Sequence, residues 1–313
     1  MKKPILIVLT FLLLGTAAVY VFIPSTITVS ETAAIRCVAD AAIRKLTDKT
    51  SWPGWWPGKI ETAPDGTALY QLNNTVYTVS QRMLHTLALQ IKHNGDTVGS
   101  HLSVLNLPGD SAIIKWECRL EAGKNPFQRI KTYREAIALK KNMDSVTAAL
   151  QHYLSSFENV YGVAFREAST ADTVLISTRA VSPVYPSTAF VYGMVDKLRD
   201  FCKNSKCTIT GPPMLNVTAL DTGRFQVMVA LPVEHSVAGN GDIQLQKMIP
   251  GRFIIADVKG GPHAIENTHR QLLHFFQDYH RTAMAIPFEY LITDRVKESD
   301  TSKWVTRIYS PVY

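Results

Sequence analysis

Glu289 is the residue of this chain whose setting best suits chemistry. It follows Pro287-Phe288 and precedes Leu291-Ile292 in a run of strand-forming residues. A carboxylate among apolar neighbours is costly to desolvate unless a cation or hydrogen-bond donors pair with it. Two interpretations follow: Glu289 binds a cationic or hydroxylic ligand, or it is a strand residue that faces solvent.

The motifs of common catalytic and metal sites are missing from the sequence. Four histidines crowd the last amphipathic stretch, but their steps of six, five and six place no two of them on one helical face as an i,i+4 pair would: His263, His269, His274 and His280. The sequence contains no HExxH, GxSxG, phosphate loop or dinucleotide fingerprint. We therefore predict no metal, no cofactor and no assigned catalytic residue.

An internal repeat organises the second half of the chain. The apolar segment at Val174 and the proline at Pro183 recur 79 positions later, at Phe253 and Pro262 (174 to 253, 183 to 262). Each copy reads as a short β-branched segment, an amphipathic stretch and two further apolar segments, so we predict two β-α-β-β units over about 172–233 and 251–312. The loop 294–303 makes the second copy longer near its end. Two such units packed together would leave a cleft at their junction.

The second copy carries the residues of a known family. The order glycine-proline turn, helix, Pro287-Phe288-Glu289-Tyr290 and then Ile308 to Val312 resembles the GyrI-like small-molecule-binding domain, which also forms the effector-binding half of BmrR-type regulators. The resemblance covers about 163–313. It implies a ligand pocket at the seam of the two units, with one acid among aromatic residues. We expect that site to contain Glu289, Tyr185, Tyr309, Phe190 and Trp304.

The segment before the repeat is expected to be a second α+β domain. From Thr26 to Glu121, strand-like segments are separated by turn residues such as Asn94-Gly95, and the last one, 111–121, alternates apolar and charged residues. Asn125-Pro126 then opens a long helix whose expected apolar stripe includes Phe127, Ile137 and Val146.

This order, with Trp52, Trp55 and Trp56 after the first short helix, resembles the SRPBCC or START-like superfamily over about 26–160. The resemblance implies a helix-grip fold around an apolar cavity. Trp55 and Trp56 would then either line the mouth of that cavity or plug the gap between helix and sheet.

The N-terminal segment is expected to be a membrane anchor. Met1-Lys2-Lys3 precedes about twenty residues without a charge, up to Ile23, and the positive-inside rule would keep the tail cytoplasmic and export the rest. A cleaved signal peptide is the alternative, since Gly15 to Ala18 offers small residues. We thus expect a single-pass protein of a bacterial inner membrane, with an anchor at 1–24 and periplasmic domains at 25–162 and 163–313.

Charge and cysteines restrict the partners. The net charge of +7 is spread over 313 residues rather than clustered, so we expect no nucleic-acid partner. Cys202 and Cys207 could form a local disulfide in an exported protein, whereas a bridge between Cys37 and Cys118 is disfavoured by antiparallel pairing. The oligomeric state stays open.

These observations leave three hypotheses for function. The favoured one is a binding protein for small apolar, amphiphilic or cationic ligands. The second is a hydrolase of small reactive molecules, in which Glu289 works with Tyr185 or Tyr309. The third is a structural or partner-binding protein whose cavities are filled.

Overall fold

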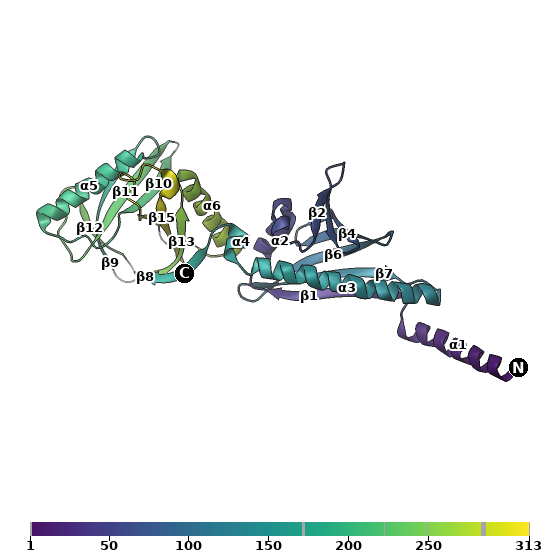
Figure 1. Cartoon of the computed structure of the whole chain (residues 1–313). Helices are drawn as coiled ribbons and strands as arrows, with labels where there is room; N and C mark the ends of the chain where they lie inside the picture. The colour runs from purple at the N-terminus through teal and green to yellow at the C-terminus, as the bar shows by residue number, and fades with distance from the viewer. Residues whose placement is uncertain (1, 171–172, 222, 249, 283–285, 313) are drawn as a thin grey trace. The chain divides into compact units, whose positions relative to one another are not determined.

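The chain folds as two compact α+β units, residues 1–160 and 161–313, and each contains one antiparallel sheet (Figure 1). The structure is a computed structural model that describes residues 2–170, 173–221, 223–248, 250–282 and 286–312. The α+β class predicted from the sequence is confirmed. The domain boundaries stay predictions.

The first unit is built on a seven-stranded sheet in the order β1-β7-β6-β5-β4-β3-β2. Apart from the first strand, neighbours in the sheet are neighbours in sequence, because tight turns join each strand to the next; β1 closes the far edge by pairing with β7. The strands are β1 (Thr26–Ile35), β2 (Lys59–Thr62), β3 (Ala68–Leu72), β4 (Thr75–Met83), β5 (Thr86–His93), β6 (Asp96–Leu107) and β7 (Ser111–Glu121). Alternate residues of β7 are buried, as its sequence pattern predicts.

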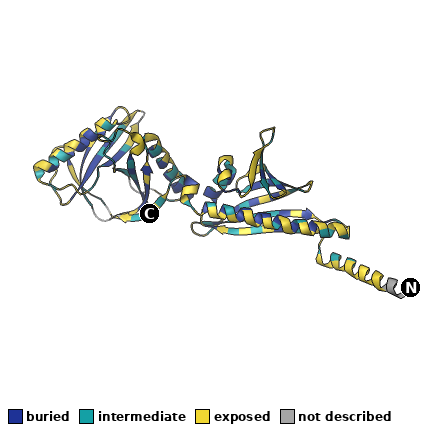
Figure 2. Ribbon diagram, in the orientation of Figure 1, coloured by how far each residue is buried: buried dark blue, intermediate teal, exposed yellow. Residues whose placement is uncertain are grey.

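The long helix α3 (Pro126–Leu154) packs against β1 and β7. The Asn125 side chain accepts a hydrogen bond from the Phe127 backbone N–H, and Pro126 occupies the first turn, where a missing N–H costs nothing. One face of α3 is buried (Figure 2), but it differs from the predicted stripe: Phe127 and Ile137 are exposed, whereas Thr132 and Asn142 are buried. Smaller and polar residues therefore form much of the contact with the sheet.

Aromatic side chains fill the interior of the first unit. They come from η1 (Lys49–Gly54), which follows the short helix α2 (Ala39–Thr47), from the two residues directly after η1, and from β3, β4 and β7. The buried members are Trp52, Trp55, Trp56, Tyr70, Tyr77 and Trp116. The rings of Trp52 and Tyr70 lie 4.0 Å apart between centroids, and the Trp52 indole N–H donates to the Leu46 carbonyl at 2.9 Å. Trp55 and Trp56 thus pack inside an aromatic cluster.

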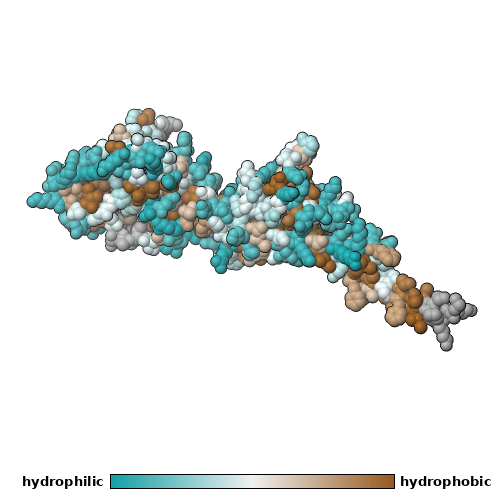
Figure 3. Space-filling model, in the orientation of Figure 1, coloured by the Kyte–Doolittle hydropathy of each residue, from teal (hydrophilic) through white to brown (hydrophobic). Residues whose placement is uncertain are grey.

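The predicted membrane anchor is wrong. Helix α1 (Lys2–Phe22) exposes apolar side chains such as Phe11 and Val21 (Figure 3). Crossing a bilayer, however, takes a helix that is both long and apolar enough, and none in the described part of the chain meets both conditions. The predictions of a single-pass inner-membrane location and of the membrane as a partner rested on this anchor and are wrong as well.

The second unit is an eight-stranded sheet in the order β12-β9-β11-β10-β14-β15-β13-β8. The first copy of the repeat supplies β9 (Thr173–Ser182), α5 (Thr188–Ser205), β10 (Met214–Asp221) and β11 (Arg224–Val233). The second supplies β13 (Gly251–Lys259), α6 (Pro262–Asp278), β14 (Phe288–Leu291) and β15 (Val305–Val312). Each copy follows the expected order of strand, helix and two strands, and β8 (Phe165–Thr170) and β12 (Gln244–Met248) extend the two edges. The helix α4 (Phe157–Tyr161) and the 3-10 turn η2 (Thr301–Lys303) complete the elements.

The two copies meet where β10 pairs with β14. Two residue pairs, Met214 with Tyr290 and Leu215 with Glu289, form this junction, and the strand order is mirrored on either side of it. We call this junction the seam. It places Glu289 at the centre of the sheet.

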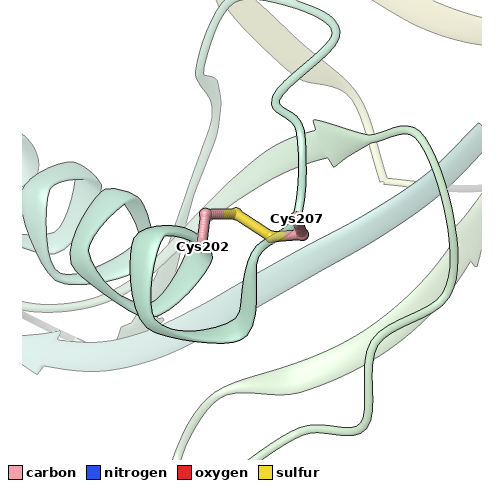
Figure 4. Close-up of a disulfide and its surroundings, with 2 residues drawn as sticks. All are labelled: Cys202 and Cys207. Atoms are coloured by element: carbon pink, nitrogen blue, oxygen red, sulfur yellow. A yellow bond between two sulfur atoms is a disulfide. The ribbon is translucent and has the colours of Figure 1, made fainter.

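A disulfide joins Cys202, in the last turn of α5, to Cys207 just beyond the helix (Figure 4). Between them, Lys206 has the left-handed backbone conformation that commonly ends a helix. The local bridge that the spacing allowed is therefore present, while Cys37 and Cys118 remain buried thiols.

Candidate functional site

A pocket of about 700 Å³ lies within the second unit, over the seam. Both copies contribute to its wall, and most of the lining atoms are apolar. Its lining residues are Tyr185, Pro186, Ser187, Thr188, Val191, Tyr192, Leu215, Asn216, Val217, Pro262, His263, Ile265, Glu266, His269, Pro287, Phe288, Glu289, Arg295 and Trp304. This volume is within the range of pockets that hold drug-sized molecules.

The N-terminal turns of both helices reach the pocket. Ser187 caps α5 by accepting a hydrogen bond from the Phe190 backbone N–H, and both Ser187 and Thr188 line the wall. In the second copy, Pro262 lies in the first turn of α6, and both Pro262 and the adjacent His263 line the pocket. The positive ends of two helix dipoles therefore lie at the pocket, where they favour negative charge.

The Glu289 carboxylate is largely buried and has a cationic or polar neighbour at each oxygen. Its side chain is 12% exposed. The Oε1 atom lies 3.0 Å from His269 Nε2, on α6, and the Oε2 atom lies 3.7 Å from an Arg295 guanidinium nitrogen. Glu289 is thus neither turned to bulk water nor isolated in an apolar wall.

Arg295 is held in place by three further contacts. Its guanidinium donates a hydrogen bond to Thr306 Oγ1 at 2.8 Å and lies over the Trp304 ring, 4.8 Å from the centroid. Its backbone N–H donates to the Tyr192 hydroxyl at 2.8 Å. Burial lowers the pKa of Arg295, and the negative charge of Glu289 opposes that shift. Since arginine ordinarily titrates far above neutral pH, the pocket contains a fixed positive charge beside its acid.

Three of the residues predicted for this site lie together in the pocket: Glu289, Tyr185 and Trp304. Phe190 and Tyr309 are not among its lining residues. Phe190 is 37% exposed on α5, and Tyr309 stacks on Phe288 at 4.9 Å. Across the β14–β15 pairing Tyr309 is opposite Phe288, one position from Glu289, so it points to the other face of the sheet.

The remaining predicted ligand residues, Trp55 and Trp56, belong to the aromatic cluster of the first unit. They are 4% and 7% exposed, and the Trp56 indole N–H donates to the Gln71 carbonyl at 3.1 Å. Their position corresponds to the plugging role that the sequence left open. A ligand role for them stays a prediction.

Tyr185, which lines the pocket together with Tyr192, is poorly suited to act as a base or nucleophile. Partial desolvation and, secondly, the charge of Glu289 raise the pKa of Tyr185, although 61% of the residue is exposed. A phenol with a raised pKa is protonated at neutral pH, whereas a base or nucleophile must shed its proton. Tyr185 can still donate a hydrogen bond to a bound molecule.

Metal ligation finds no support in the described residues, where no group of three or more His, Cys, Asp or Glu side chains is arranged to hold an ion. In particular, the pocket histidines His263 and His269 and the acids Glu266 and Glu289 do not form such a group.

Sequence reasoning missed Arg295 and assigned His269 no role. Arg295 lies in the 294–303 loop, which is the segment that lengthens the second copy relative to the first. An insertion within a duplicated unit was therefore the available signal, since the corresponding connection of the first copy, between Asp221 and Arg224, is much shorter. For His269, the useful signal was its place on the buried side of α6, near Thr268 and Leu272.

Comparisons with known proteins give low structural likeness and no sequence family. No family model matches the chain, and no curated protein matches it. Among solved structures, the EcmrR–DNA complex is 16% identical with a TM-score of 0.45, covering 59% of this chain and 70% of that one. The EcmrR C-terminal domain is 16% identical with a TM-score of 0.43, covering 48% and 98%. SAV2435 bound to tetraphenylphosphonium is 15% identical with a TM-score of 0.32, covering 48% and 93%.

One of these structures corrects a prediction made from charge alone. We expected no nucleic-acid partner, but a chain similar to this one was solved in a complex with DNA. We base the function of this chain on its own pocket.

Proposed function

We propose that the second unit binds a small, mainly apolar molecule that carries a polar group, in the pocket over the seam. The observation that carries the proposal is a cavity of about 700 Å³ whose apolar wall surrounds a buried carboxylate and a guanidinium group. Apolar walls supply affinity through desolvation, and a few fixed polar groups set the orientation of the ligand. The resemblance of residues 163–313 to GyrI-like domains supports the same function.

We propose a supporting role for the first unit. Its helix-grip order of elements would allow a cavity, but six large aromatic side chains are buried in its interior. Such side chains occupy the space that a ligand would need. We therefore assign ligand binding to the second unit.

A fluorescence titration tests the main proposal. The neutral apolar dye 1-N-phenylnaphthylamine is added to the intact protein and to two variants, Val217→Trp and Val181→Trp. Val217 lines the pocket, whereas Val181 is exposed on β9 and is not a lining residue. We expect saturable binding that Val217→Trp weakens at least about tenfold and Val181→Trp leaves unchanged. Absence of binding, or equal binding by both variants, would refute the proposal.

A further inference from the structure

The two buried charged side chains of the pocket balance one another. Glu289 and Arg295 have nearly equal exposure, 12% and 11% of their side chains, and their charged groups lie 3.7 Å apart. The other acid of the lining, Glu266, is exposed, so water and salt screen its charge more strongly. A ligand that enters the pocket therefore meets a buried pair whose net charge is zero.

The position of Arg295 bears directly on the ligand. A cationic ligand would have to share the Glu289 carboxylate with a guanidinium group that is already next to it. Thr306, Trp304 and the backbone contact to Tyr192 hold Arg295 there, so moving it aside would break several contacts at once. An added cation would also leave the buried site with an excess positive charge, which is costly in a poorly solvated environment.

We infer that Arg295 is a built-in counter-ion that determines the ligand's charge: the pocket accepts uncharged molecules with a hydrogen-bonding group and rejects both lipophilic cations and lipophilic anions. This inference rests on the proposed function and specifies its ligand class. Glu289 repels an anion as Arg295 repels a cation. The positive ends of α5 and α6 weigh less, because Ser187 and His263 at those ends are exposed and water and salt screen the helix dipoles there. The neutral ligand's polar group is left to hydrogen-bond with donors and acceptors of the wall, among them Tyr185 and Asn216.

Three aryl probes of different charge test the inference: triphenylphosphine oxide, tetraphenylphosphonium and tetraphenylborate. The two ions share one shape, and the neutral probe has an oxygen in place of the fourth phenyl ring. Each is titrated by calorimetry into the intact protein at about pH 8, where an ordinary imidazole is uncharged. Four forms are compared: the wild type, Arg295→Met, Glu289→Gln and the double variant. Arg295→Met keeps much of the side-chain length and removes the charge; Glu289→Gln keeps the shape and removes the opposite charge.

The inference predicts a reversal of preference. The wild type binds the neutral probe at least about tenfold more tightly than either ion; Arg295→Met prefers the cation, Glu289→Gln prefers the anion, and the double variant prefers the neutral probe again. A merely structural role for Arg295 would weaken all three probes alike. An unchanged order of preference across the four forms would overturn the inference.

Two controls keep the outcomes separate. Circular dichroism confirms that each variant is folded, and Arg295→Gln, which keeps a donor for Thr306, replaces Arg295→Met if the latter unfolds. If the wild type binds none of the three probes and also fails to bind the neutral dye, the proposed function itself is refuted. If it binds the cation as tightly as the neutral probe, binding stands and the role of Arg295 is refuted.

Discussion

Breaking the Cys202–Cys207 disulfide should destabilise the second unit by a calculable amount. The bridge spans five sequence positions. In the chain-entropy treatment, a closed loop of about this length removes about 7 cal/mol/K from the unfolded chain, which stabilises the folded unit by about 2 kcal/mol at room temperature. For a urea dependence of about 2 kcal/mol/M, reduction should lower the unfolding midpoint by about 1 M.

Urea unfolding of the intact protein measures this effect with and without a reducing agent. Four of the five tryptophans are in the first unit, so their fluorescence follows that unit while circular dichroism follows both. The double variant Cys202→Ala, Cys207→Ala serves as the control, because the reducing agent should leave its midpoint unchanged. Because Cys37 and Cys118 are buried, alkylation is carried out in denaturant, where it should label two of the four cysteines before reduction and all four after it. Equal midpoints for the oxidised and reduced wild type would refute the entropy estimate.

Two further predictions concern the first unit. Burial raises the pKa of Tyr77 to about 12 and that of Cys118 to about 11. Both groups therefore lose their protons more readily in the unfolded chain than in the folded one, so high pH favours unfolding. The free energy of unfolding should be unchanged below about pH 9 and should fall by up to about 3 kcal/mol per group as the pH rises to about 12. Urea midpoints followed by tryptophan fluorescence between pH 8 and 12 should show this decline, with a smaller early loss in Cys118→Val; a flat profile would contradict it. Secondly, Gly58→Ala should cost about 3 kcal/mol, because a Cβ atom there would lie 1.7 Å from the Gln71 carbonyl oxygen. Gly99→Ala meets nothing within 4 Å and should be neutral or slightly stabilising in the same assay, so equal effects of the two changes would contradict the prediction.

Much of the fold follows from periodic patterns in the sequence. The alternation of 111–121 and the turn at Asn94-Gly95 predict strands that the structure contains as β7 and as the pair β5–β6. The constant offset between the copies predicts the strand, helix and two strands of each one. These features are local or repeated, so each residue's neighbours determine its state.

The contact face of α3 could not be predicted from hydrophobicity alone. Asn142 is buried because it accepts a hydrogen bond from Asn73 at 2.7 Å and donates one to Thr75 at 3.2 Å, both in or near the sheet. Partners so distant in sequence leave no periodic signal. Phe127 is exposed near the start of the helix, at a position that the period alone assigns to the buried face.

The pocket was predictable only in part, for a similar reason. Glu289 stands out because an acid in an apolar strand is unusual, and the repeat places it at the junction of the copies. Arg295 belongs to an irregular loop, whose backbone is positioned by the Tyr192 hydroxyl from the other copy. The two contacting residues are about a hundred positions apart in the sequence, so the position of Arg295 can be read only from the folded structure.

The seam also shows what is gained when two copies of a unit are joined in one polypeptide. Leu215 and Glu289 hold corresponding places in the two copies, and they are paired directly across the sheet. Separate, identical subunits related by a twofold axis would have to carry the same residue at both places, and two acids there would resist ionising together. A fused chain is free of that constraint, because one copy can carry the acidic residue while the other keeps an apolar one. An asymmetric ligand can therefore bind in a single orientation.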